Sequence, residues 1–570
     1  MLVVDEETLC PQEVSKEVVV SGATGPTSSL GSQVPEPPRR TLKANPSIVS
    51  NYQPSNLAET MIFWWVTQMG PDIEIDFLNA MRRFATIVPD GVATRWSLFA
   101  GSGVATRIYE ALEVVLQSHL GIQVAFDSCL YAEHKEEKQA HLMDQFSPRF
   151  LISEVGHLKE PSAKNLARGG AVELLPYCFS LDGGPPCTSR TPLSSRRSSN
   201  LNCVQEAREA TGVGFSDVLA VTKEHWPQMI SLECVKELNQ ESGDQAAQSD
   251  SEWVISQLQS AGYWAHTDTM DAEEFGSYPA RVRTYWSGLM NLKGKPQEIS
   301  HFFNRVLVAC KSAGDESNVW DWIDIDDEVR AASSAKSGIP LHSSFGLYRK
   351  SKTLKEDQQW KHEHMSIFHL NGFAWPFEYD DLPVGNAVVE IGGMFPREVE
   401  ATVFLHLVFP FDESNTFEFI DINPTLPRIV KRHLDEDTSR PKEPATTPWR
   451  PRPPTLVGSG KLLVRYKNPE QVLTVRLVEC FETMRMVGWD DSRWKIGRCV
   501  SQDETYPELI SNMAGNAYSL FHFGPWILAS LATFGRFWDP ELASGTRVAG
   551  DSDNEGCVVE SSSSEGSLFD

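Results

Sequence analysis

The chain has 570 residues, of which 41% are hydrophobic, enough to bury a large core and to form folded units with flanking tails. Its formal net charge of −26 argues against binding nucleic acid through the overall field, because a polyanion needs local Lys or Arg side chains. The ten cysteines show no CxxC spacing, so we predict neither a zinc site nor a disulfide scaffold, and no bound metal.

Both ends of the chain have the composition of disordered segments. Residues 1–55 are rich in Pro, Ser, Gly and Thr, and residues 546–570 are acidic and rich in Ser. The N-terminus lacks a basic region followed by an apolar run, so we expect no secretory or transit peptide. The longest uncharged stretch, residues 518–535, contains Gly524 and Pro525, and we expect a buried helix there and no membrane span.

The first folded segment is predicted to be a helical cap over residues 56–94, which contain the apolar run 61–66. From Arg95 an apolar strand runs into the glycine turn 99–103, and the next apolar residues have helical spacing: Val104, Ile108, Leu112 and Leu116. This pattern predicts a strand, a turn and a helix whose N-terminus can face a ligand. By itself a GxG turn is a weak signal.

Two more strand ends are expected at the same rim of the sheet. The strand at residues 123–132 leads to Glu133, at the distance where nucleotide-binding sheets place an acid for ribose hydroxyls. A solvated glutamate is the alternative for this residue. The segment 150–158, which contains His157, supplies the next strand end.

The stretch Ser180–Thr188 ends an apolar segment in Gly183-Gly184-Pro185-Pro186, a sharp turn that holds out Cys187. A thiol presented in this way is a candidate nucleophile, although a structural cysteine is the alternative. The Ser/Arg-rich loop that follows offers three residues that could meet phosphate: Arg190, Arg196 and Arg197.

Charged residues also occur in two later strands. Burial of the apolar strand 228–235 would make an ionised Glu233 costly, so this side chain is paired, protonated or functional. In the strand near residue 282, alternation places Arg281 and Arg283 on one face.

The order of these residues resembles the cytosine-5 DNA methyltransferase family. Residues 97–103 are similar to its cofactor-binding first motif, and Glu133 to its ribose-binding acid. Pro186-Cys187 resembles its nucleophile motif, Glu233-Cys234-Val235 its Glu-Asn-Val motif, and Arg281-Val282-Arg283 its Gln-x-Arg-x-Arg motif. Residues 476–489 and 515–517 are similar to its ninth and tenth motifs.

The resemblance covers about residues 95–288 and 452–535. It implies an α/β Rossmann-like, S-adenosylmethionine-dependent methyltransferase fold with a smaller inserted target-recognition region. The expected units are a catalytic core at 95–290, an insert at 291–451 and a return to the core at 452–545. The implied cofactor-binding residues are Phe99, Ala100, Gly101, Ser102, Gly103, Glu133, His157, Pro185, Asn516 and Ala517.

The implied chemistry follows from the residue types. Carbon 5 of cytosine is a poor nucleophile, so the Cys187 thiolate would first add to carbon 6. Glu233 would donate toward ring nitrogen 3, and Arg283, together with Arg281, would hold the oxygen at position 2. The target base must leave the duplex stack before this attack.

Four positions depart from the family pattern. Thr188 follows the nucleophile where Gln or Asn is usual, Cys234 replaces the Asn of Glu-Asn-Val, and Pro279 stands where Gln opens the Arg motif. His157 replaces the acid that usually contacts the adenine amine. Because the nucleophile, the acid and both arginines are present, we expect an active enzyme.

The insert has basic clusters that are candidates for backbone contacts, among them Arg349 and Lys350, and an apolar run at 401–409 that predicts a strand. We expect methyl transfer to DNA, in the nucleus of a eukaryote or otherwise in the cytoplasm, with no membrane partner. Transfer to a tRNA cytosine and a catalytically silent scaffold that retains the fold are the alternatives.

Overall fold

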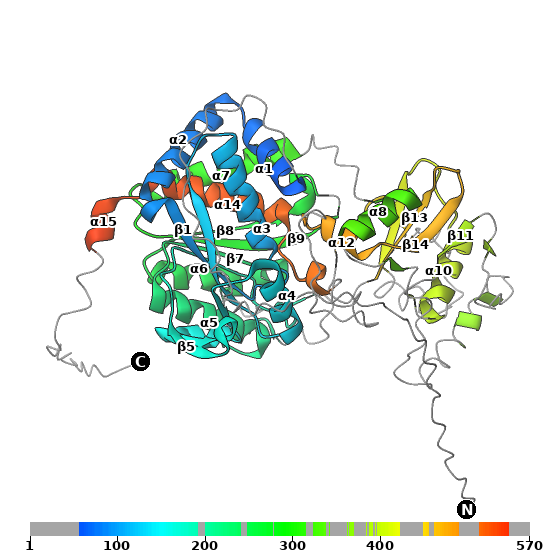
Figure 1. The fold of residues 1–570 in the computed structure, drawn as a ribbon, viewed down its shortest axis with the longest axis horizontal. Helices are drawn as coiled ribbons and strands as arrows, with labels where there is room; N and C mark the ends of the chain where they lie inside the picture. The colour runs from blue at the N-terminus through cyan, green and yellow to red at the C-terminus, as the bar shows by residue number, and fades with distance from the viewer. Residues whose placement is uncertain are drawn as a thin grey trace, which may run out of the picture. The chain divides into compact units, whose positions relative to one another are not determined.

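The computed structural model describes most of the chain outside its two ends (Figure 1). The described residues are 56–191, 200–240, 248–277, 279–314, 323–337, 341–342, 362, 364–366, 368–369, 383–384, 387–390, 394, 396–421, 449–454, 456, 461–489 and 512–545. The predicted disordered tails at 1–55 and 546–570 lie outside them.

A seven-stranded sheet with the order β3-β2-β1-β6-β7-β9-β8 is the main element of the structure. Its strands are β1 Val92–Leu98, β2 Ala125–Ala132, β3 Phe150–Ile152, β6 Ser180–Gly183, β7 Met229–Val235, β8 Trp264–Asp271 and β9 Val282–Leu289. The strands β3, β2, β1, β6 and β7 pair with their neighbours in parallel, whereas β9 is antiparallel to both β7 and β8. The predicted α/β fold class with a largely parallel sheet is therefore confirmed.

The strand order reverses between β1 and β6. In open parallel sheets, ligands bind beyond the carboxyl ends of the strands at such a switch point. Here β1 ends at Leu98, immediately before the glycine turn, and β6 ends at Gly183, immediately before the cysteine loop. The topology therefore places these two sequence features beside each other.

Helices cover both faces of this sheet (Figure 1). On one face, α14 (Leu520–Phe537) packs against α1 (Leu57–Thr67), α2 (Pro71–Ile87), α3 (Val104–Ser118) and α7 (Pro296–Gly314). The other face carries α5 (Glu209–His225) and α6 (Asp250–Ser260). Two further helices are α4 (Glu136–Phe146) and α15 (Pro540–Gly545), and β4 (Ser162–Asn165) pairs with β5 (Ala171–Leu174). No helix among the described residues is long and apolar enough to cross a membrane.

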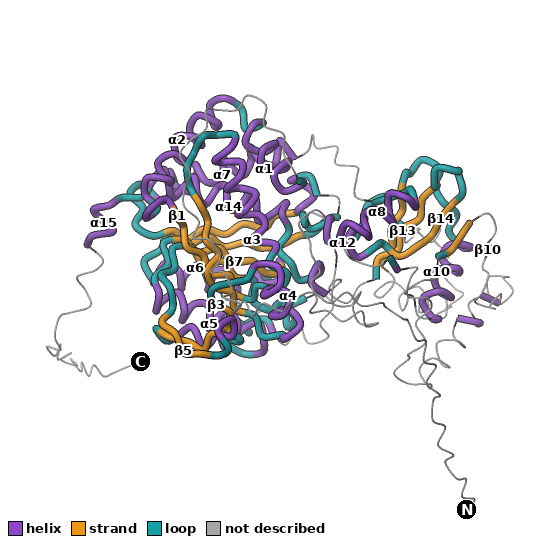
Figure 2. The backbone as a smooth tube through the Cα atoms, viewed as in Figure 1, coloured by secondary structure: helices purple, strands orange, loops and turns teal. Residues whose placement is uncertain are grey.

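A second, five-stranded sheet has the order β10-β11-β14-β13-β12. Its strands are β10 Pro383–Val384, β11 Ala387–Val389, β12 Phe417–Asp421, β13 Leu462–Lys467 and β14 Leu473–Leu477, and the helices of this region are α8 Asp327–Ser337, α10 Pro396–Val408 and α12 Cys480–Arg485. The strand predicted at 401–409 is wrong, because this run lies in helix α10 (Figure 2). A continuous apolar run does not distinguish a buried strand from a buried helix.

A fully buried ion pair joins the two strands at the switch point. Arg95 of β1 donates to Oδ1 of Asp182 of β6 from Nε at 2.9 Å and from Nη2 at 2.6 Å, and both side chains are 0% exposed. The other carboxylate oxygen accepts from Ser97 at 2.9 Å, and the guanidinium lies 3.8 Å from the centre of the Tyr109 ring. Arg95 also donates from Nη1 to the Ser128 hydroxyl of β2 at 2.5 Å. Because the partners belong to β1, β2, β6 and α3, the cluster fixes the strand ends that carry the two loops.

We predict that Asp182→Ala lowers the free energy of unfolding by about 3–5 kcal/mol, because it leaves the Arg95 charge buried without its carboxylate. Asp127→Ala is the matched control. It removes the partner of Arg149, which lies at 2.7 Å but with both side chains partly exposed, and is expected to cost less than about 1 kcal/mol. Urea unfolding followed by tryptophan fluorescence measures both changes, and equal losses would contradict the assignment.

Candidate active site

The glycine turn after β1 has a backbone that suits close approach of a ligand. Gly101 and Gly103 have φ of 57° and 75°, a left-handed conformation in which a side chain is strained. A Cβ on Gly103 would collide with the Phe146 ring of α4, whereas a Cβ on Gly101 would meet only the Phe99 carbonyl oxygen, at 3.7 Å. The space in front of Gly101 is therefore open.

Glu133, at the end of β2, is held against this turn. Its carboxylate accepts from the backbone N–H of Gly101 at 2.9 Å and from that of Lys135 at 3.1 Å, and the residue is 5% exposed. A freely solvated glutamate, the alternative from the sequence, does not describe this geometry. His157 is exposed on the short turn of helix Val155–Lys159 after β3, with Nδ1 3.4 Å from the Ser153 hydroxyl.

Helix α5 shapes the loop that carries Cys187. A Cβ on Gly214 would lie 2.9 Å from Pro186 Cδ and 3.3 Å from Pro185 Cβ, so the absence of a side chain lets the helix pack directly on both prolines. Cys187 itself is partly exposed and packs against the core on the α5 side of the sheet.

Arg190 stabilises the same loop from inside. Its guanidinium is fully buried and donates to the carbonyl oxygens of Asn200, at 3.1 Å, and Glu237, while its backbone N–H donates to the Cys187 carbonyl at 3.0 Å. This differs from the predicted phosphate contact, because a guanidinium bound to two buried carbonyl groups does not face solvent. The serine- and arginine-rich composition of the loop gave no sign that one arginine would turn inward.

Glu233 and Arg283 form an ion pair across neighbouring strands. Arg283 Nε lies 2.9 Å from Glu233 Oε1, and both side chains are largely buried. The register of β7 and β9 pairs Glu233 with Tyr285 and Val235 with Arg283. Alternation then places Arg281, Arg283 and Tyr285 on the face of the sheet that Glu233 occupies. Of the three states considered for Glu233, the structure shows the paired one.

Arg281 is committed to the main chain of the C-terminal segment. Its guanidinium donates to the carbonyl oxygens of Ala517 at 2.7 Å, Gly515 at 3.2 Å and Leu456 at 3.4 Å, and the residue is 4% exposed. It thereby attaches the expected tenth motif to β9. These bonds occupy donors that the predicted contact with a base would need, so Arg281, directly before β9, and Arg283, within β9, differ in their surroundings.

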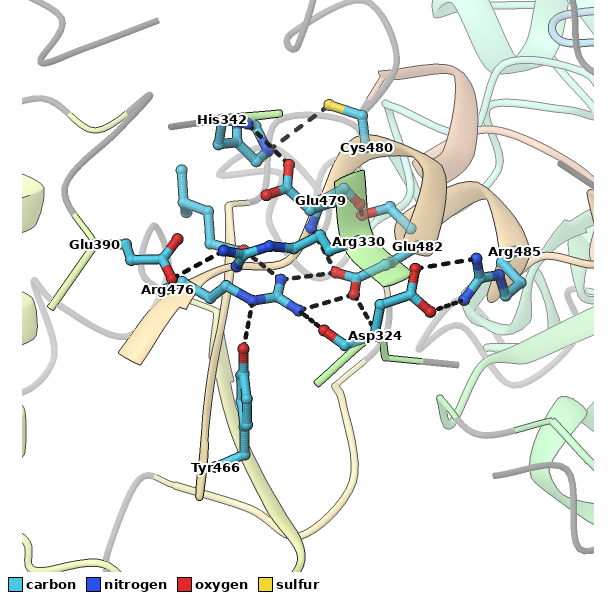
Figure 3. A network of polar contacts seen from close by, with 12 residues as sticks. Asp324, Arg330, His342, Glu390, Tyr466, Arg476, Glu479, Cys480, Glu482 and Arg485 are labelled. Atoms are coloured by element: carbon cyan, nitrogen blue, oxygen red, sulfur yellow. Dashed lines mark hydrogen bonds and ion pairs between the residues drawn. The ribbon is translucent and has the colours of Figure 1, made fainter. Parts of the chain in front are cut away.

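The residues similar to the ninth motif form a polar network (Figure 3). Arg476 of β14 donates to both carboxylate oxygens of Glu482 of α12 at 2.8 Å, and both side chains are buried. The Asp324 carboxylate accepts a hydrogen bond from Arg485 at 3.1 Å, and the Asp324 carbonyl oxygen accepts one from Arg476. This bidentate pairing ties α12 to the second sheet, and no donor of the Arg476–Glu482 pair is left for a ligand.

In comparison with known proteins, part of the chain matches a family model. Residues 168–362 match the family model described as C-5 cytosine-specific DNA methylase. The matched region includes Cys187, Glu233, Arg281 and Arg283, and it begins after the glycine turn and Glu133.

Three solved structures are similar to this chain. The Dnmt2 methyltransferase of S. pombe is 12% identical with a TM-score of 0.36, covering 77% of this chain and 98% of that chain. A putative DNA modification methyltransferase encoded within a prophage, from E. coli, is 13% identical with a TM-score of 0.33, covering 77% and 98%. The Entamoeba histolytica methyltransferase EhMeth is 11% identical with a TM-score of 0.34, covering 77% and 97%. No curated protein matches the chain.

The remaining predicted site residues divide into two groups. Asn516 is exposed, with its amide on the Asn512 carbonyl oxygen at 2.9 Å, and Ala517 is 3% exposed. Four predicted nucleic-acid-binding residues lie outside the described part of the chain: Arg196, Arg197, Arg349 and Lys350. Among the described residues, no cluster of His, Cys, Asp and Glu is placed to hold a metal ion.

Sequence reasoning did not single out three buried residues near the candidate site: Arg95, Asp182 and Tyr518. A signal existed for Asp182, because it is a charged residue inside an apolar strand, the pattern that singled out Glu233. Tyr518 lies one residue beyond the expected tenth motif, and its 6% exposure could not be foreseen from the sequence.

The charges around Cys187 act on its thiol in opposite directions. Burial raises the pKa of the Cys187 thiol, Arg283 opposes this, and Glu233 reinforces it. The thiol is therefore held largely protonated near neutral pH, and its thiolate form depends on the positive charge of Arg283.

We predict that Arg283→Gln slows alkylation of Cys187 by iodoacetamide at pH 8 by about threefold, and that Glu233→Gln accelerates it by a similar factor. The first change removes a cation that favours the thiolate, and the second removes an anion that disfavours it. Mass spectrometry of the peptide that contains Cys187 gives the rate at this residue. Lys159→Gln, which removes an exposed cation elsewhere, is the control, and equal rates in all variants would contradict the shared electrostatic site.

Proposed function

We propose that the protein transfers a methyl group from S-adenosylmethionine to carbon 5 of cytosine in DNA through a covalent bond between Cys187 and the base. The observation that supports this proposal is the buried ion pair of Arg283 and Glu233, 2.9 Å apart, whose two charges both shift the pKa of the Cys187 thiol. A nucleophile, a proton donor and a fixed fork of N–H donors are the groups that this reaction requires.

Residues at the end of β1 and β2 fit the cofactor. The open space at Gly101 admits a ligand, Glu133 can accept from ribose hydroxyls, and the buried Ser102 hydroxyl has no hydrogen-bond partner among the described residues. When bound, S-adenosylmethionine supplies an activated methyl group. Phe99, Gly103 and Pro185 border the same turn, and Asn516 would complete the site from the C-terminal segment.

The chain's own residues would perform the steps at the base. The Cys187 sulfur adds to carbon 6 as its thiol loses its proton, and Glu233 takes up that proton and donates it to nitrogen 3, which makes carbon 5 nucleophilic. The oxygen at position 2 accepts from Arg283, which would exchange its present partner Glu233 for the base. After methyl transfer, loss of the proton from carbon 5 allows the sulfur to leave.

Two observations favour DNA over tRNA as the substrate. The matched family model is that of a DNA methylase, and the segment between the paired arginines and the ninth motif, about 160 residues, is large enough for a separate groove-reading unit. We propose that this insert, residues 291–451, contacts the DNA backbone through clusters such as Arg349 and Lys350. Arg281 would act by holding the C-terminal segment in place.

We predict that labelled methyl groups are transferred from S-adenosylmethionine to cytosines of duplex DNA in preference to tRNA, with both substrates assayed at the same low salt. Gly101→Asp should abolish transfer to either substrate, because a charged side chain would enter the open turn at a φ of 57°.

Bisulfite sequencing of both substrates locates the modified base. Methyl transfer to tRNA alone would contradict DNA as the substrate and would support the alternative, tRNA. No transfer to either, by a folded protein that still binds the cofactor in a calorimeter, would favour the scaffold alternative.

A further inference from the structure

A buried tyrosine hydroxyl lies beside Glu233 without a partner. Tyr518 is 6% exposed, and its hydroxyl makes no hydrogen bond among the described residues. A buried polar group in this state is costly unless a ligand or a movement supplies the missing partner. Burial raises the pKa of this hydroxyl well above its ordinary value, so it remains a proton donor throughout the working range of pH.

The Tyr518 hydroxyl and the Glu233 carboxylate both lie next to Gly184. The position that a Cβ on Gly184 would take lies 3.7 Å from the Tyr518 hydroxyl oxygen and 3.5 Å from Glu233 Oε2. The two polar atoms therefore border the same gap in the loop that leads to Cys187. The other carboxylate oxygen, Oε1, faces Arg283 at 2.9 Å. Oε1 of Glu233 thus faces Arg283, whereas Oε2 lies near Gly184 and Tyr518.

The position of Tyr518 is fixed from both directions. The preceding carbonyl oxygens, of Gly515 and Ala517, are bound by Arg281, and the ring packs on Phe523 with centroids 4.4 Å apart. Tyr285, the other buried tyrosine near Glu233, packs its ring on His522 and Trp526 of α14, at 5.7 and 5.5 Å. The Tyr285 hydroxyl also has no hydrogen-bond partner among the described residues, but the tyrosine atoms among the three nearest to a Cβ on Gly184 are those of Tyr518.

We propose that the Tyr518 hydroxyl donates a hydrogen bond to Glu233 Oε2 during turnover and so keeps the carboxyl proton on Oε1. This inference rests on the proposed function. When Arg283 turns to the base, Glu233 loses its ion-pair partner, and Tyr518 is the donor that can hold the carboxyl group. An oxygen that accepts from a hydroxyl is a poor site for the proton. The proton that the Cys187 thiol loses is then held on Oε1, moves to nitrogen 3 as sulfur adds to carbon 6, and returns to Glu233 when sulfur leaves.

Tyr518 is therefore a positioning residue that acts through Glu233, and a double-mutant cycle tests this role. Tyr518→Phe removes only the hydroxyl and should lower the single-turnover rate of methyl transfer by roughly tenfold, with an unchanged half-saturating cofactor concentration. In the Glu233→Gln background the same change should have no further effect. A purely structural role would lower the rate by the same factor in both backgrounds.

Two other tyrosines provide matched controls. Tyr263→Phe removes a buried hydroxyl that donates to the Pro227 carbonyl at 2.8 Å, away from Glu233, and should leave the rate near that of the wild type. Tyr285→Phe should also leave it near the wild-type rate. The inference would be overturned if Tyr518→Phe and Glu233→Gln had additive effects on the rate, or if Tyr285→Phe and not Tyr518→Phe were coupled to Glu233→Gln. Methyl transfer by the wild-type protein would still support the proposed function in that case. A wild-type protein without transfer would overturn both.

Discussion

The buried ion pair between Arg95 and Asp182 is the constraint on which the site depends. Two opposite charges removed from water are stable only if each remains fully paired, so β1 and β6 are held in one register at the switch point. The glycine turn begins one residue beyond β1, and the cysteine loop begins directly after β6. Any change in this pair would therefore move the proposed cofactor turn and the proposed nucleophile relative to each other.

A second set of buried arginines extends the same principle. Arg190 binds main-chain carbonyl groups under the cysteine loop, and Arg281 binds those of the C-terminal segment. A guanidinium has five donors in a rigid fork, which makes it suited to hold irregular backbone that no strand or helix satisfies. In both cases the loop that presents a proposed site residue is supported by a cation beneath it. Among the described residues, Arg283 is paired with the Glu233 carboxylate and the neighbouring Val282 carbonyl, so it remains able to change partners.

Much of this arrangement follows from the sequence because it is local. The glycine turn follows an apolar strand and precedes a helical pattern, and alternation alone places Arg281 and Arg283 on one face. The destination of each guanidinium is not local, since it depends on carbonyl groups more than 200 residues away in the case of Arg281. The helix at 396–408 was mistaken for a strand because its apolar run lacks a distinguishing period. The buried position of Arg190 likewise depends on Glu237, in another segment of the chain.

The central claim is that Cys187 forms a covalent bond with the target base, and trapping of that bond tests it most directly. A cytosine with fluorine at carbon 5 cannot lose this atom as a proton, so elimination stalls after methyl transfer. With S-adenosylmethionine and a duplex that contains this base, the wild-type protein should give a complex resistant to denaturant, and mass spectrometry should locate the adduct on Cys187. Cys187→Ser should give none, because a hydroxyl is scarcely ionised near neutral pH, while Cys203→Ser should trap as the wild type does. Trapping that persists in Cys187→Ser and disappears in Cys203→Ser or Cys234→Ser would contradict the account.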